Sequence, residues 1–426
     1  MSLHQKFFWI CESVLLIFSA TSFCQTGLSN ARSFGLGGAY TALASGVDAA
    51  RWNPANLGLH RTPNFSIHFA SFGAGVYNNA FSKSDYDLYN GAYLTAGRKT
   101  EILSRLPADG WRFNFAGETD LLGFSYRHCA VAVGLDFASD ARLARDFLDL
   151  ILNGNRLNRR YNFSGTGGSG LALLSVGFSY GRSLRAPFLK NQLKKFSAGG
   201  TIKYVRGLAS AEVINAAGSM ITKLEGIFGD ARATVRRATG GNGLALDFGA
   251  AAMVNERLSL GLSLRHALGF INWSRDAKEY RYGVAADSLT AVEWASAGAD
   301  SVIRHHAKTR DLAAGFTQRL PAVIHIGAAY NQGRVLLSGE LVQGLENRLS
   351  ASTTPELRLG AEGHLLKYLL PRIGLSLGGK RRASSAIGLG LAVGSFQTDV
   401  AVGTWGGILP LQSKGLGFAF GMRIGI

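Results

Sequence analysis

Apolar residues alternate with small or polar ones along most of the chain after residue 60. In the last eleven residues, 416–426, Leu, Phe, Met or Ile stands at every second position, and glycine, alanine or arginine stands between them. A period of two predicts a β-strand with one apolar face. About 9–11 residues are enough for a tilted strand to cross a bilayer. The C-terminal segment therefore has the pattern and the length of a membrane strand.

The same alternation recurs throughout the sequence and predicts about fourteen strands, with uncertain boundaries. Clear repeats lie at 243–250, 257–265, 372–378, 387–394 and 416–426, further runs at 65–72, 122–127, 131–137, 174–180, 202–205, 324–330 and 335–342, and weaker ones at 357–365 and 396–404. The segment 273–310 carries mixed charge and is expected to be an extracellular loop.

A soluble β-sandwich would also alternate, so the membrane assignment needs further support. The small-residue face carries charges in mid-strand, such as Asp247, Arg265 and Glu340, which suits a watery lumen. The opposite face is almost continuously apolar over strands of membrane length. A sheet in lipid must close on itself because lipid cannot satisfy a free edge. We therefore expect an all-β fold, a transmembrane antiparallel β-barrel of a Gram-negative outer membrane.

Composition supports this fold class. Glycine is abundant (55 of 426 residues), proline is rare (8), and charged residues make up 17%, against about 25% in soluble domains. Beyond the N-terminal region, no run of about 18 apolar residues predicts a membrane helix. Few charges and many glycines suit closely packed strands that face lipid.

The N-terminus has the features of a secretion signal. Lys6 precedes a mostly apolar run from Phe7 to Phe23, and small residues follow at 19–22. We expect residues 1–24 to be a signal peptide, cleaved after Ser22 or Cys24. Two alternatives stay open, lipid attachment at Cys24 and a retained N-terminal helix, although Glu12 interrupts the short apolar run.

Cysteine content and charge exclude several classes of protein. The three cysteines, Cys11, Cys24 and Cys129, give neither a disulfide framework nor a CxxC metal site. The net charge of +17 is scattered, without interleaved stacking aromatics, so nucleic acid is not an expected partner. In an exported barrel this charge suits outer-membrane lipid, anionic lipopolysaccharide or an anion-friendly lumen.

Residues 25–61 do not have a strand pattern. Glycines at 35, 37 and 38 are followed by a helix-compatible stretch, 40–50, and by a turn at Trp52, Asn53, Pro54 and Ala55. This segment resembles the N-terminal hatch, or plug, of the outer-membrane long-chain fatty acid transporter superfamily, whose Asn-Pro-Ala motif matches residues 53–55. A type IX secretion-associated branch is also similar. The resemblance is closest to uncharacterised relatives, because it continues through a short helix at 99–107 and a helical stretch at 141–152.

The resemblance implies a barrel of about fourteen strands, closed from the periplasmic side by a hatch with short helices. It also implies that a hydrophobic, fatty-acid-like ligand enters from outside, that the hatch shifts, and that the ligand leaves laterally through a kinked wall strand. The expected domains are the signal peptide 1–24, the hatch 25–61 and the barrel 62–426. The final strand resembles the signal that the barrel insertion machinery recognises, although it ends in Ile426 rather than in an aromatic residue.

Four arginines are predicted to face the lumen and are candidate contacts for an anionic head group: Arg257, Arg265, Arg372 and Arg423. The alternative is that they pair with lumen carboxylates such as Asp247, Glu340 and Glu362.

Catalytic chemistry is not expected, and neither is a cofactor or a metal. The glycine-rich stretch 165–170 lacks the context of a nucleophile elbow and the ending of a phosphate loop, and the adjacent His305 and His306 would face opposite ways in a strand. Three functions remain: uptake of hydrophobic small molecules, a binding or secretion-shuttle barrel of the type IX kind, and a structural surface protein.

Overall fold

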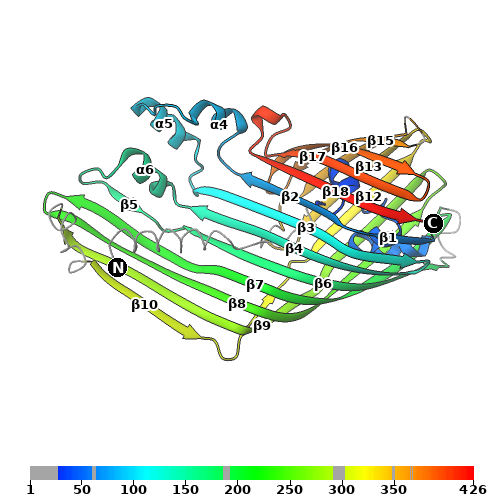
Figure 1. Cartoon of the computed structure of the whole chain (residues 1–426), viewed down its shortest axis with the longest axis horizontal. Helices are drawn as coiled ribbons and strands as arrows, with labels where there is room; N and C mark the ends of the chain where they lie inside the picture. The colour runs from blue at the N-terminus through cyan, green and yellow to red at the C-terminus, as the bar shows by residue number, and fades with distance from the viewer. Residues whose placement is uncertain are drawn as a thin grey trace.

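The computed structural model describes residues 27–59, 64–185, 192–290, 303–347, 351–364, 366 and 368–426, which form a closed antiparallel β-barrel around a short helical segment (Figure 1). The expected signal peptide, 1–24, lies outside the described residues. None of the helices in the described part of the chain is long and apolar enough to span a membrane.

Fourteen strands make the wall, as the alternation predicted. Two of them are interrupted, and the last pairs with the first, which closes the barrel. A short additional strand, β5 (Arg160–Asn162), pairs with β7 near the C-terminal end of that strand. The wall strands are β1 (Phe65–His68) continued by β2 (Ser71–Asn78), β3 (Trp111–Tyr126), β4 (Cys129–Leu143), β6 (Gly167–Leu184), β7 (Lys195–Lys223), β8 (Gly226–Met253), β9 (Leu258–Leu289), then β10 (Ile303–Asp311), β11 (Phe316–Arg319) and β12 (Val323–Asn331) in one line, β13 (Val335–Gly344), β14 (Glu356–Gly363), β15 (Leu369–Gly378), β16 (Arg382–Val393), β17 (Phe396–Trp405) and β18 (Gly415–Gly425).

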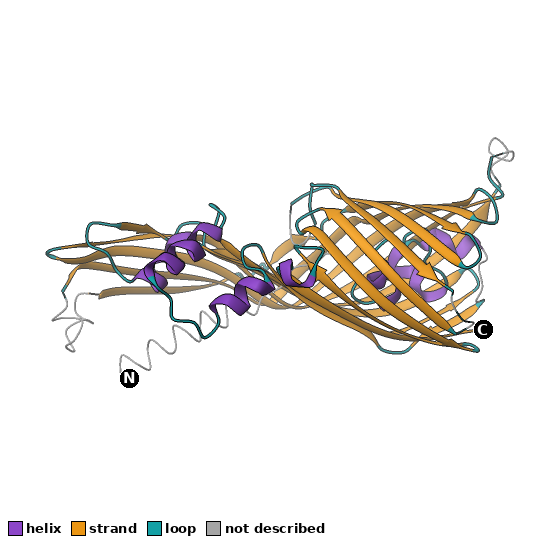
Figure 2. Ribbon diagram, turned by 90° about the horizontal axis from the view of Figure 1, so that it is seen from above, coloured by secondary structure: helices purple, strands orange, loops and turns teal. Residues whose placement is uncertain are grey.

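Helices occur in the lumen and in the connections at one end of the barrel. We call residues 27–59 the plug; it contains α2 (Ala31–Gly35), η1 (Gly46–Asp48), α3 (Ala49–Trp52) and η2 (Pro54–Leu59), and it lies inside the barrel (Figure 2). The connections contain α4 (Lys83–Tyr89), α5 (Ala96–Arg105), α6 (Arg145–Asn153) and η4 (Pro410–Gln412). The helix expected at 99–107 is thus present as α5, and that expected at 141–152 begins later, because β4 continues to Leu143.

The alternation in sequence corresponds to two faces of the wall. In β18, Leu416 and Phe418 are exposed on the outside, whereas Ala419 is fully buried on the inside. Glycines on the inner face leave room for the plug backbone. A Cβ at Gly249 would lie 2.0 Å from Asn53 Oδ1, and one at Gly374 would lie 1.9 Å from the Gly37 nitrogen. The wall therefore needs glycine where the plug touches it.

Three strands are far longer than a membrane requires. β7, β8 and β9 have 29, 28 and 32 residues, and with β10 they extend beyond the barrel as a sheet that we call the blade (Figures 1 and 2). The blade lies at the end with the long connections, which is extracellular in outer-membrane barrels. The expectation of a loop at 273–310 is therefore wrong over 273–289 and 303–310, because these residues pair as β9 and β10.

A row of polar side chains marks where the blade leaves the apolar band. On the outer face, Arg206 Nη1 donates to Asn242 Oδ1 over 2.6 Å, and Thr317 Oγ1 donates to Asn272 Oδ1 over 2.7 Å. These four residues are in register across β7, β8, β9 and β11. Because the outer face of a membrane barrel is apolar where it meets lipid, we place the end of the apolar band at this row.

Candidate functional site

The Asn-Pro-Ala motif fastens the plug to the wall. Asn53 is fully buried; its Nδ2 donates to the Ala250 carbonyl over 3.0 Å, and its Oδ1 accepts from the Ala55 nitrogen over 3.1 Å. Trp52, which precedes the motif, lies edge-on to Tyr40 with the ring centroids 5.3 Å apart. Pro54 and Ala55 are also buried. The motif thus shapes a turn and ties it to β8.

Replacing Asn53 with Ala should loosen the plug without preventing barrel formation. The substitution removes both hydrogen bonds and leaves the Ala250 carbonyl without this donor, a loss of about 1–3 kcal/mol. We expect faster protease cleavage within the plug while the barrel keeps its heat-modifiable migration on gels. Loss of that migration would instead assign the motif to the folding of the barrel.

Arg51 joins the plug to two neighbouring strands. Its guanidinium donates to Asp120 of β3 and to Asp136 of β4, and all three side chains are largely buried. A buried cation between two carboxylates offsets the cost of removing each charge from water. This contact holds the plug against the wall between β3 and β4.

A second ionic group lies on the other side of the plug. Arg32 makes two 2.8 Å hydrogen bonds to Glu362, and Arg372 Nε donates to the same carboxylate over 2.6 Å. Arg372 Nη1 also donates to Asp399 over 2.7 Å. Two arginines and two carboxylates thus link α2 to β14, β15 and β17.

Asp48 is the centre of a third group. It accepts from Tyr40 Oη at 2.7 Å and from Arg423 Nη1 at 3.0 Å, and His68 Nε2 lies 3.1 Å away. Burial and the adjacent Asp48 carboxylate raise the pKa of Tyr40 to about 12, so its hydroxyl remains a donor. Nearby, Glu340 accepts from the backbone nitrogens of Tyr40 and Thr41 over 2.9 and 2.8 Å.

The four predicted arginines are not in one place. Arg265, Arg372 and Arg423 are on the inner face, and the last two are ion-paired, as the alternative interpretation anticipated. Arg257 is exposed in the turn between β8 and β9, at the short-turn end, because β9 begins only at Leu258. Arg265 contributes to a lumen cavity. Direct contact of these residues with a ligand stays a prediction.

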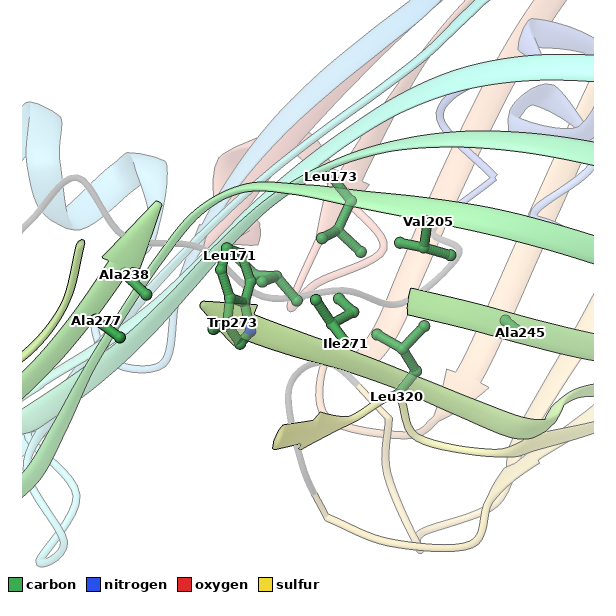
Figure 3. Close-up of a cluster of buried hydrophobic side chains, with 9 residues drawn as sticks. All are labelled: Leu171, Leu173, Val205, Ala238, Ala245, Ile271, Trp273, Ala277 and Leu320. Atoms are coloured by element: carbon green, nitrogen blue, oxygen red, sulfur yellow. The ribbon is translucent and has the colours of Figure 1, made fainter. Parts of the chain in front are cut away.

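An apolar cluster lies in the lumen on the extracellular side of the plug (Figure 3), and we call it the apolar ring. The sequence did not reveal this cluster. Its members lie on the neighbouring strands β6, β7, β8 and β9 and on the segment before β12, and Leu173 points toward Ile271 and Leu320. Leu171, Ile271 and Trp273 are almost completely buried. The ring consists of Leu171, Leu173, Val205, Ala238, Ala245, Ile271, Trp273, Ala277 and Leu320.

Trp273 is the largest member of the ring, and its position is fixed. Its Nε1 donates to Gln318 Oε1 over 2.9 Å, and its ring stacks on Phe316 with the centroids 6.3 Å apart. A Cβ at Gly207 would lie 2.5 Å from the indole, so glycine is needed there. A signal in the sequence was present: at 171–174 and 270–273 apolar residues occupy both faces of the strand.

Between the ring and the plug is a cavity of about 60 Å³. Its lining includes the apolar side chains of Leu173, Val205 and Leu320 and the polar ones of Arg51, Lys203, Arg265 and His266. Lys203 is ion-paired with Asp247. A cavity of about 150 Å³ is what accommodates benzene, so this cavity is too small for a molecule of that size. A larger molecule would fit here only if the plug or the ring moved.

The wall is interrupted beside the plug. β1 ends at His68 and β2 begins at Ser71; Ala70 has a φ of 49°, and Phe69 is 40% exposed. On the neighbouring β3 the register shifts between Asp120 and Leu122. Arg51 pairs with Asp120 directly beside this interruption. The lateral exit through a kinked wall strand that the resemblance implied stays a prediction. Within the described residues, no cluster of three or more His, Cys, Asp or Glu side chains could hold a metal ion.

Comparison with solved structures identifies the fold. The toluene transporter TodX of P. putida aligns over 92% of this chain and 97% of its own, at 10% identity and a TM-score of 0.52. The monoaromatic hydrocarbon channel CymD covers 95% and 99% at 12% identity with a TM-score of 0.53. A FadL homologue of Pseudomonas aeruginosa covers 95% and 98% at 11% identity with a TM-score of 0.50. At the level of the fold, the predicted likeness to the long-chain fatty acid transporter superfamily is confirmed.

These three proteins are described as a transporter, a channel and a FadL homologue, which agrees with the expectation that the chain is not an enzyme. No curated protein matches the sequence significantly. A family model described as "Family of unknown function (DUF5723)" matches residues 57–238 and 225–402. The chain is therefore a member of this DUF5723 family, with the fold of a plugged outer-membrane barrel.

Proposed function

We propose that this protein takes up hydrophobic small molecules across the outer membrane. The observation that carries the proposal is the apolar ring, a buried apolar cluster on the inner face of the wall at the extracellular side of the plug. Burying apolar side chains around a water-accessible lumen favours an apolar occupant. The toluene transporter and the monoaromatic hydrocarbon channel that share the fold support the same class of cargo.

In this proposal a molecule enters from the blade end and reaches the ring, and the plug blocks its path to the periplasm. The Arg51 contact with Asp120 connects the plug to the strand beside the wall interruption. Movement at this contact would open a lateral exit between β1, β2 and β3, next to Phe69 and Ala70. Of the predicted arginines, Arg265 is placed best to meet an acidic head group, because it lines the cavity below the ring.

Export and partners complete the proposal. Residues 1–24 would be removed during secretion, 25–61 would act as the hatch, and the barrel insertion machinery would recognise β18. Outer-membrane lipid and lipopolysaccharide would surround the apolar band and the basic connections.

A polar substitution in the ring tests the proposal. Leu173→Asp places a carboxylate among apolar side chains, which repels a hydrophobic cargo, and we expect about a ten-fold slower passage, or 1.4 kcal/mol. Passage is measured as uptake of ¹⁴C-toluene and ¹⁴C-oleate by proteoliposomes that contain the full chain. Leu173→Met keeps the volume and apolarity and should retain the normal rate. Equal rates for Leu173→Asp and the unmodified protein would contradict a path through the ring.

A further inference from the structure

A group of basic side chains lies on the outer face of the wall where the blade begins. We call it the outer basic cluster; it consists of Arg206 of β7, Arg237 of β8, and Arg275 and Lys278 of β9. Arg206 belongs to the row of polar side chains that ends the apolar band, and the other three lie beyond this row toward the blade. The cluster is therefore at the level where lipid head groups are expected.

Neighbouring residues on the same strands establish that Arg237 and Lys278 point outward. Ala238 and Ala277, which are next to them in the sequence, are buried in the apolar ring on the inner face. Successive residues of a strand point to opposite faces. Arg237 and Lys278, which are paired across β8 and β9, consequently extend from the wall into the surroundings of the barrel.

Arg206 and Arg275 both lie against Gly240. A Cβ at Gly240 would be 3.0 Å from Arg275 Cβ and 3.5 Å from Arg206 Nη2. The hydrogen bond from Arg206 Nη1 to Asn242 holds one guanidinium in place, and the Arg275 side chain is exposed. Two arginine side chains on different strands thus converge on one point of the outer face.

The cluster has an excess of positive charge. Among the described residues, Lys278 alone of the four cations makes an ion pair, with Asp311 at 3.7 Å. The other nearby carboxylate, Asp276, accepts a hydrogen bond from Thr239 Oγ1 over 2.9 Å. Four cations therefore stand against two carboxylates, and like charges side by side repel each other unless an anion lies between them.

The phosphate of a lipid is the anion that fits this cluster. Guanidinium groups bind phosphate oxygens through parallel hydrogen bonds, and basic groups at the end of a membrane-spanning segment attract anionic lipid head groups. Exposed apolar side chains, including Tyr204 and Leu244, lie on the membrane side of the cluster and can contact acyl chains. A lipid phosphate would be held at this level by both contacts, whereas a soluble anion would gain only the first.

We propose that the outer basic cluster binds a phosphate of the lipid A part of lipopolysaccharide, with Arg206 and Arg275 as the principal contacts and Arg237 and Lys278 beside them. This site makes specific the contact with lipopolysaccharide proposed above. It rests on the outer-membrane location and not on uptake through the lumen. The bound glycolipid would fix the base of the blade at the membrane surface.

Native mass spectrometry of the full chain in detergent, titrated with diphosphorylated lipid A, tests the site. The double variant Arg206→Gln, Arg275→Gln keeps hydrogen-bonding amides but loses both charges, and it should bind lipid A about ten-fold more weakly. The matched control is Arg127→Gln, Arg334→Gln, which removes two exposed arginines from the short turns after β3 and β12 at the opposite end of the barrel. It should bind like the unmodified protein. Arg275→Gln alone changes an exposed side chain and should show about a three-fold loss.

Competition identifies the source of the anion. Dephosphorylated lipid A should bind to the unmodified protein about as weakly as lipid A binds to the Arg206→Gln, Arg275→Gln variant, and inorganic phosphate should not displace lipid A. Tight binding of the dephosphorylated lipid would overturn the proposal, and displacement by inorganic phosphate would indicate a site for a soluble anion instead.

The variants separate this site from the uptake proposal. Equal affinities of the two double variants for lipid A, with both folded by heat-modifiable migration, would contradict the assignment. If the double variant does not fold, an unchanged affinity of Arg275→Gln would contradict it equally. Toluene uptake should stay normal when Arg275 is replaced. Equal uptake by Leu173→Asp and the unmodified protein would refute passage through the ring and leave the lipid A site unaffected.

Discussion

Gly249→Val should release the plug from a barrel that still folds. A Cβ at this position would lie 2.0 Å from Asn53 Oδ1 and 3.2 Å from Pro54 Cδ, so a valine side chain and the docked motif exclude each other. Valine itself suits a strand, so β8 should still pair. We expect a higher single-channel conductance in planar bilayers and rapid proteolysis of the plug.

Gly200→Val is the matched control for this substitution. Gly200 is on the adjacent strand β7, opposite Phe248, and a Cβ there would meet its nearest neighbour at 3.6 Å, an ordinary contact. This variant should conduct like the unmodified protein. Equal conductance of both glycine variants would show that the motif does not hold the plug in place.

Arg51→Met should have the second large effect. It leaves Asp120 and Asp136 buried beside each other without the shared cation, and breaking a buried ion pair in this way costs about 3–5 kcal/mol. We expect the plug to loosen near β3, which a lower thermal transition and frequent channel openings would report.

The carboxylates can be neutralised to separate charge from packing. Adding Asp120→Asn and Asp136→Asn to Arg51→Met removes the unpaired charges and should recover most of the lost stability. If the triple variant is as unstable as Arg51→Met alone, the contribution of Arg51 is the packing of its side chain rather than its charge.

The sequence was sufficient to predict the barrel because a strand with one face in lipid and one in a lumen must alternate. The β18 pattern predicted its two faces correctly. Alternation does not, however, reveal where the membrane ends. The β9 segment beyond Trp273 continues as a strand in water, where charged and apolar faces both occur, and its mixed charge was therefore interpreted as a loop.

The candidate site was predictable only in part. Asn53 and its neighbours were recognisable as a local motif, and the lumen position of Arg372 follows from its place in an alternating strand. The pairing of Arg51 with Asp120 and Asp136 joins residues 69 and 85 positions apart, and one sequence contains no local signal for such a contact. The apolar ring was missed because inward Leu171 and Ile271 stand next to outward apolar residues, so their strands look uniformly apolar.

Native mass spectrometry of the full chain, released from membranes without added lipid, tests the central claim most directly. The account predicts an uncharged or acidic hydrophobic small molecule bound to the unmodified barrel and to Leu173→Met. It predicts a marked loss of this species in Leu173→Asp. An empty lumen in all variants, with a stably bound protein partner instead, would contradict uptake and favour a secretion-shuttle function.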